Sequence, residues 1–184
     1  MDKSLLELPF VLNTRRNHAL EHATLHVLAE KYPAKPMAGH SNPTGFFILG
    51  NVPTEDVESA VEQASSRLRA GERGLAIHPG CGTNLATSAL VAATFAWFAM
   101  RGGKSTFGRL LRLPLAIAFA FVGALVSRPL GPILQEKITT DADLGNLQVI
   151  SVKPALSGRV QGWAVFLEAA EHPCDRNQWR AEFV

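Results

Sequence analysis

Charged side chains are missing from two long stretches of this chain of 184 residues. No Asp, Glu, Lys or Arg occurs from Gly74 to Met100, and Arg128 alone interrupts the run from Leu113 to Leu134. Because an apolar helix needs about 20 residues to cross a bilayer, we expect these stretches to form two membrane spans. Two buried helices of a soluble protein are the alternative, but so short a chain has little other sequence with which to cover them.

Charge of one sign is not in excess, and cysteine is scarce. The formal net charge is +2, which gives no indication of a nucleic acid partner. The two cysteines, Cys81 and Cys174, are compatible with thiols, metal ligands or a disulfide. They therefore do not define the compartment in which the protein works.

The segment between the two spans, residues 101–112, carries four positive charges and no negative one. The positive-inside rule would place this basic loop in the cytosol and both termini outside. In contrast, residues 1–13 contain Asp2 and Glu7 and lack the pattern of a secretory signal. Basic residues also lie shortly before the first span, at Arg67, Arg69 and Arg73. On balance we expect cytosolic termini.

Histidine, in contrast to cysteine, is concentrated in one short segment of the chain. His18, Glu21, His22 and His26 recur at steps of three and four residues, so they share one face of a helix. We expect this helix to begin at Asn13 or Thr14 and to end near Tyr32, before two prolines. Imidazoles one turn apart can bind one ion. The alternative is that these histidines are surface or packing residues.

A second motif lies just before the first span, where His78 and Cys81 stand three residues apart in a glycine-rich turn. Both side chains offer groups that bind zinc well, and both could complete a site begun by the helix histidines. A tight turn into the membrane, with His78 and Cys81 packed beside it, is the equally simple reading. Asp141 and Asp143 lack the rest of a calcium-binding loop and are expected in a solvated turn.

The order of predicted strands and helices outside the two spans predicts an α+β fold. Two C-terminal strands, with Ser157-Gly158 in the turn between them, should join the N-terminal strands in one sheet. A small extramembrane sheet-and-helix domain would then be interrupted by a two-helix transmembrane hairpin, giving an N-terminal part over residues 1–82, the hairpin over 83–134 and a C-terminal part over 135–184. Strands are expected at 36–40, 45–50, 75–78, 147–152 and 163–168, and a second helix at 54–70.

Two resemblances add to this reading. His18, Glu21 and His22 resemble the inverted zincin motif His-x-x-Glu-His, which implies two zinc ligands and Glu21 as general base; a third ligand would come from His78, Cys81 or Glu168. The segments 16–24, 45–46 and 76–84, with two spans, resemble an uncharacterised family of small bacterial membrane proteins carried as a domain of unknown function. That resemblance implies a location in the bacterial inner membrane, and no activity.

We therefore expect a membrane-anchored metal-dependent hydrolase, with a peptidase as one form of it. Glu21 would be catalytic, and zinc would be bound by residues among His18, His22, His26, His78 and Cys81. A membrane peptide or an amphiphile would be the substrate. The alternative is a non-enzymatic membrane protein that binds a metal, haem or another tetrapyrrole, or an assembly subunit that contacts a partner or a further copy of itself. If the protein is an assembly subunit, the basic loop between the spans would contact anionic lipid headgroups.

Overall fold

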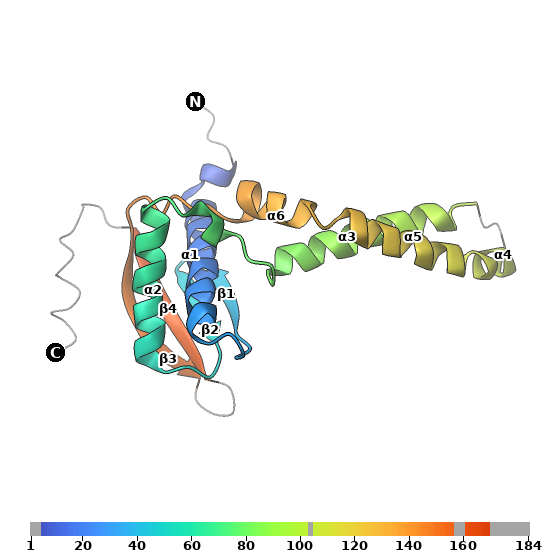
Figure 1. Ribbon diagram of the computed structural model, residues 1–184. Helices are drawn as coiled ribbons and strands as arrows, with labels where there is room; N and C mark the ends of the chain where they lie inside the picture. Colours follow the sequence, from blue (N-terminus) through green and yellow to red (C-terminus); the bar gives the residue numbers. More distant parts are fainter. Residues whose placement is uncertain (1–4, 103–104, 157–160, 170–184) are drawn as a thin grey trace. The chain divides into compact units, whose positions relative to one another are not determined.

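A computed structural model describes residues 5–102, 105–156 and 161–169 of the chain. The predicted turn at Ser157-Gly158 and the candidate ligand Cys174 lie outside these residues. Two compact units make up the chain: one comprises the residues up to His78 and those from Ile138 onward, and the other comprises Pro79–Lys137. Figure 1 labels the elements of both units.

The first unit is built on helix α1 (Pro9–Lys31), which follows a short 3₁₀ turn, η1 (Leu5–Glu7). Proline is favoured in the first turn of a helix because its missing N–H would have no partner there. The helix therefore starts at Pro9, and the predicted start at Asn13 or Thr14 was wrong. It ends where predicted, and the Tyr32 N–H donates to the Leu28 carbonyl over 2.8 Å.

The sheet has four antiparallel strands in the order β1-β2-β4-β3. Pairing of β2 with β4 brings the N-terminal and C-terminal halves of the chain together, as predicted. Gly45 is required at this pairing, because a Cβ there would overlap the Val165 carbonyl. The strand bounds are β1 (Ala38–Asn42), β2 (Gly45–Leu49), β3 (Leu147–Leu156) and β4 (Gly162–Ala169).

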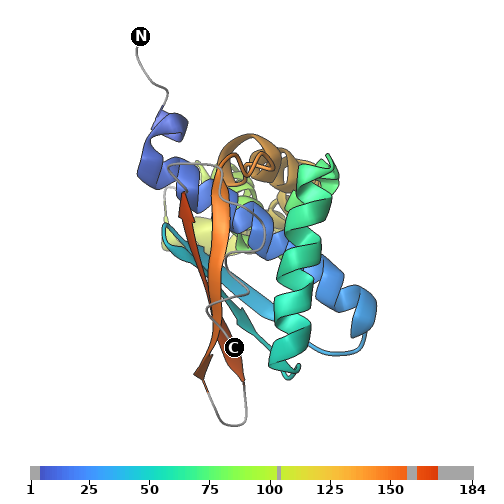
Figure 2. The ribbon, with the colours of Figure 1, turned by 90° about the vertical axis from the view of Figure 1, so that its left-hand side faces the viewer.

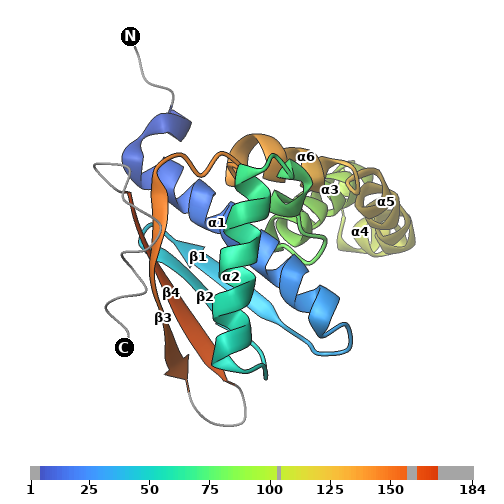
Figure 3. The ribbon, with the colours of Figure 1, turned by 60° about the vertical axis from the view of Figure 1, so that its left-hand side comes forward.

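Helices α1 and α2 (Thr54–Arg69) pack on the same face of this sheet (Figure 2, Figure 3). Alternation along a strand sends every second side chain to that face, so Phe46, Ile48 and Val165 are fully buried beneath the helices. The indole of Trp163 is also buried and donates to the Thr54 hydroxyl over 3.1 Å. The sheet and its two helices confirm the predicted α+β class.

The predicted strand at residues 75–78 was wrong. Residues Arg73–Ala76 form a 3₁₀ turn, η2, in which the Leu75 N–H donates to Glu72 and the Ile77 N–H to Gly74. The carbonyls of Ala76 and Ile77 accept hydrogen bonds from histidine side chains of α1. These carbonyls are therefore paired with the first helix, where a strand would have paired them with the sheet.

The second unit is helical and contains α3 (Gly82–Met100), α4 (Thr106–Leu111), α5 (Leu113–Val126) and α6 (Leu130–Leu134). Helices α3 and α5 lie side by side (Figure 1). Their close approach depends on Gly123, because a Cβ there would lie 3.0 Å from the Cα of Ala92. The hydroxyls of Ser127 and Ser88 bond across the pair over 2.9 Å.

By length and composition, one helix among the described residues could cross a membrane, Gly82–Met100. A second candidate is a pair of segments, Leu113–Val126 and Leu130–Thr139, which are bent by 52° at the break between them. Pro129 falls at this break, and Pro132 lies in the first turn of the segment that follows it; a proline ring removes a helical hydrogen bond and favours a kink. The predicted first span is thus a single helix, while the predicted second span is broken.

Candidate metal centre

The predicted histidine face exists on α1. His22 is buried, with 1% of its surface exposed, and His18 and His26 are half-buried on either side of it, one turn away. A helix rises about 1.5 Å per residue, so neighbouring members of this series lie about 6 Å apart along the axis. The apolar residues Leu20, Ala23 and Val27 pack in the core and hold the helix in place.

Each of the three helix histidines bonds a backbone carbonyl through one ring nitrogen. A carbonyl oxygen can only accept, so the nitrogen that faces it must carry the hydrogen. In the neutral ring this fixes the tautomer and leaves the other nitrogen with the lone pair that a metal needs. The pairs are His18 Nδ1 with Thr139 O at 2.9 Å, His22 Nδ1 with Ala76 O at 2.7 Å and His26 Nε2 with Ile77 O at 2.9 Å.

His78 completes a row of four imidazoles. Its ring centroid lies 5.6 Å from that of His22 and 4.9 Å from that of His26, while the rings of His18 and His22 are 4.3 Å apart. Burial, and to a smaller extent the positive charges of His26 and His22, lower the pKa of His78 from 6.5 to about 4. At neutral pH this ring is therefore uncharged, which is the form that binds a metal.

One ion cannot use all four rings. A nitrogen of a histidine ligand lies about 2.0–2.1 Å from zinc, so two rings on the same ion have centroids no more than about 6.5 Å apart. His18 and His26 are eight residues apart, which is about 12 Å along the helix axis. Within this unit the ring nitrogens of His18 and His22 lie within 4.8 Å of each other, and the ring of His78 neighbours those of His22 and His26.

Glu21 is buried between α1 and the sheet, with 4% of its surface exposed. Its carboxyl group lies against Gly39 of β1, where a Cβ would overlap it. The glutamate therefore points to the sheet side of α1, whereas His22 and His26 point to the Ala76–His78 segment. Its predicted role as a general base stays a prediction.

Cys81 and Glu168 are the other predicted ligands. Cys81 is in the second unit, where it precedes α3 and its sulfur accepts from the Thr83 N–H over 3.4 Å. Glu168 is exposed on β4, opposite Gln148 of β3. For both, the role of a ligand stays a prediction.

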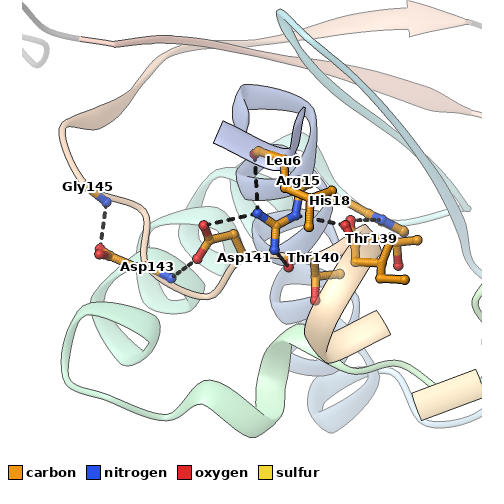
Figure 4. A network of polar contacts seen from close by, with 9 residues as sticks. Leu6, Arg15, His18, Thr139, Thr140, Asp141, Asp143 and Gly145 are labelled. Atoms are coloured by element: carbon orange, nitrogen blue, oxygen red, sulfur yellow. Dashed lines mark hydrogen bonds and ion pairs between the residues drawn. The ribbon is translucent and has the colours of Figure 1, made fainter. Parts of the chain in front are cut away.

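Arg15 is a functional residue that sequence reasoning missed (Figure 4). Its guanidinium donates to the Ile138 carbonyl over 2.8 Å and to the Thr140 carbonyl over 2.9 Å, and it forms an ion pair of 3.7 Å with Asp141. These bonds flank Thr139, whose carbonyl accepts from His18. Arg15 thus fixes the returning chain at the point where it orients the first histidine.

Asp141 and Asp143 form the solvated turn that was expected, without metal-ligand geometry. The Asp143 N–H donates to Asp141 Oδ1 over 3.0 Å, and the Gly145 N–H donates to Asp143 Oδ1 over 2.9 Å (Figure 4). Such bonds are typical of aspartates in turns. One oxygen of each carboxylate therefore accepts from the backbone of the same loop, while Asp141 Oδ2 faces Arg15.

Comparison with known proteins supports the family resemblance and assigns no activity. The profile of the family described as Domain of unknown function (DUF6391) matches residues 13–152. The chain is 38% identical over 151 residues to an uncharacterized protein of Picosynechococcus sp., covering 74% of this chain and 68% of the relative. No solved structure matches the chain.

Proposed function

Because the chain belongs to the DUF6391 family, whose function is unknown, we propose a function from the histidine cluster: a membrane-anchored protein that binds a transition-metal ion, with zinc as the foremost candidate. The observation that carries the proposal is the set of three ring-to-carbonyl hydrogen bonds on α1. In metal sites a histidine usually donates its second ring nitrogen to a carbonyl or carboxylate, which orients the ligating nitrogen. A histidine that only packs also needs a partner for its buried N–H, so the zinc titration described below distinguishes the two roles.

His22 is the central ligand of the proposed site, since both ligand sets that we propose contain it: His18 with His22, and His22 with His26 and His78. The set with His26 and His78 offers three imidazoles from one unit of the fold. The set with His18 offers two, and needs further ligands. Cys81 follows His78 by three residues in the chain, and its thiolate stays a predicted additional ligand. A mixed set of imidazoles and a thiolate suits zinc.

Membrane anchoring is the second part of the proposal. Helix α3 has 19 residues, which is about 28 Å of helix and close to the roughly 30 Å of a hydrocarbon core. Large apolar side chains of α3 and α5 are exposed, among them Leu90 at 70% and Ile117 at 69%. A bilayer would cover them. The small residues at the α3–α5 contact, Gly123 with Ser88 and Ser127, are of the kind that membrane helices use to approach closely.

Hydrolysis is the second candidate function, favoured by the position of Glu21 beside His22 in the spacing of the inverted zincins. Zinc, when bound, acts as a Lewis acid and lowers the pKa of a coordinated water to about 7. Glu21 would accept the proton from that water, provided its carboxylate turns from Gly39 toward the histidines. A membrane peptide or an amphiphile is the proposed substrate, because the proposed anchoring helices belong to the same chain.

Calorimetric titration of zinc into the metal-free, detergent-purified protein tests the binding proposal. His22→Ala should abolish tight binding, and His40→Ala, which removes an exposed histidine of β1, should not change it. Loss of binding in His26→Ala with retention in His18→Ala identifies the set that contains His78, and the reverse identifies the set with His18. Unchanged binding in His22→Ala refutes the proposal.

Hydrolysis is tested separately with Glu21→Gln. If Glu21 is the base, this variant retains zinc and loses turnover of a membrane-embedded peptide, while the wild-type protein cleaves it. Equal activity in both proteins would exclude Glu21 as the base. Cys81→Ser, by comparison, should weaken zinc binding if the thiolate is a ligand.

A further inference from the structure

The basic loop between α3 and α5 has a defined structure around Arg112. Its guanidinium donates to the Arg101 carbonyl over 2.7 Å and to the Ala99 carbonyl over 3.3 Å. These are among the last carbonyls of α3, which have no partner within the helix. The turn also needs Gly102, whose φ of +95° is unfavourable for other residues. Arg112 therefore positions the loop.

Arg101 and Arg109 are exposed beside apolar side chains. The Arg101 guanidinium lies over the Trp97 ring at 4.7 Å and near the Phe98 ring at 5.9 Å. Such a cation–π contact uses the face of the guanidinium, while its N–H donors lie in the plane and can still reach an oxygen. On α4, Arg109 is accompanied by Phe107, Leu110 and Leu111, with 69%, 59% and 66% of their surface exposed.

This combination of exposed arginines with exposed tryptophan and phenylalanine fits the boundary between water and lipid. Aromatic rings with polar groups concentrate at that depth, and arginine stems cover apolar surface while their heads stay in water. Residues 101–112 carry four positive charges and no acidic residue. They directly follow a helix of 19 residues, which is long enough to reach the opposite headgroup layer.

We propose that this tip of the helical hairpin, made of Trp97, Arg101, Phe107, Arg109, Leu110 and Leu111, is a binding site for anionic phospholipid headgroups. Arg101 and Arg109 donate to the phosphate, which planar guanidinium groups bind in a bidentate way. The aromatic and aliphatic side chains insert beside the acyl chains. The proposal rests on the membrane anchoring proposed above, and it is independent of the metal site.

The test uses the full chain in dodecyl maltoside micelles, titrated with phosphatidylglycerol or phosphatidylcholine while bound lipid is measured after gel filtration. Phosphatidylglycerol should bind more tightly than phosphatidylcholine. Each basic side chain contributes about fivefold in affinity for an anionic surface, so Arg101→Gln with Arg109→Gln should weaken phosphatidylglycerol binding by about 30-fold. The matched control, Lys35→Gln with Lys153→Gln, removes two exposed positive charges from the other unit and should change the affinity by less than about twofold.

Equal binding of the two lipids, or unchanged phosphatidylglycerol binding in the double arginine variant, would overturn the proposal. Displacement of phosphatidylglycerol by inorganic phosphate at the same concentration would also overturn the proposal, because that result would identify a simple anion site. Extraction of membranes with alkaline carbonate examines the anchoring itself. If the protein is released, anchoring and lipid site both fail; if it is retained without a lipid preference, the lipid site alone fails.

Discussion

Arg15→Lys should destabilise the first unit and weaken metal binding together. Lysine keeps the positive charge near Asp141, but a single ammonium cannot reproduce the forked bonds to Ile138 and Thr140, which are 2.8 and 2.9 Å long. The Arg15 side chain is only 14% exposed, so water replaces the lost bonds poorly. Loss of one such bond, together with weakening of the other, costs about 2 kcal/mol. For a chain of this size the midpoint of thermal unfolding falls by about 4–8 °C.

The same change should lower the zinc affinity by about tenfold or more, which is typical when the group that orients a metal-binding histidine is lost. Thermal unfolding is followed by tryptophan fluorescence, since Trp163 is buried in the sheet with 3% of its surface exposed. Arg67→Lys is the control, because its bonds to Glu30 and Glu72 are on the surface and should contribute less than about 1 kcal/mol. If Arg15→Lys and Arg67→Lys unfold at the same temperature, Arg15 does not fix the returning chain. A lower stability with an unchanged zinc affinity would show that the site does not depend on Thr139, and would favour the ligand set without His18.

Two further predictions concern the same unit, and a third concerns the helical unit. In metal-free protein the pKa of His78 is about 4 against an ordinary value of 6.5. Between these two pH values the unfolded chain binds a proton at this ring that the folded chain does not. The free energy of unfolding should therefore fall as the pH falls from about 6.5 to about 4. Chemical denaturation at a series of pH values should show a smaller fall for His78→Gln, and an identical fall would exclude this ring as its source. Gly39→Ala should lower the free energy of unfolding by about 1–3 kcal/mol, because the added methyl group meets the Glu21 carboxyl group. Gly74→Ala, where a Cβ meets open space, is the control. Combining Gly39→Ala with the shorter side chain of Glu21→Asp should restore part of the lost stability. If the double variant is no more stable than the sum of the two single changes predicts, the Glu21 carboxyl group does not lie against Gly39. Ser127→Ala should weaken the α3–α5 contact by about 0.6 kcal/mol, measured by the resistance of the hairpin to denaturation in detergent. The control is Thr94→Ala, which removes an exposed hydroxyl that donates to the Leu90 carbonyl of its own helix; an equal effect of both changes would argue against a role of Ser127 at the helix contact.

Much of the first unit could be predicted from the sequence because its signals are local. The histidine spacing on α1, the helix at residues 54–69 and the alternating strands that pair β2 with β4 follow from patterns within a few residues. The 3₁₀ turn at Arg73–Ala76 was mistaken for a strand for the same reason. A short apolar run indicates burial, but its hydrogen-bond partners, here two histidines of α1, lie about 50 residues away in the chain.

The supporting contacts of the site were beyond prediction because they are long-range. Arg15 and the carbonyl it holds at Thr140 are separated by 125 residues, and His18 and Thr139 by 121. Nothing in the local sequence distinguishes Arg15 from its neighbour Arg16. Similarly, the spacing of Glu21 places it beside His22 in the chain, but the contact with Gly39 depends on how the first strand crosses the helix.

Elemental analysis of the protein, purified in mild detergent without chelators, tests the proposed metal site most directly. We predict about one zinc per chain in the wild-type protein and in His40→Ala, and none in His22→Ala, because a structural or catalytic zinc site depends on each of its few ligands. Wild-type protein without metal, or an equal zinc content in His22→Ala, would contradict the account. A visible absorption band that is present in the wild-type protein and lost in His22→Ala would show that the histidines bind a tetrapyrrole and not zinc.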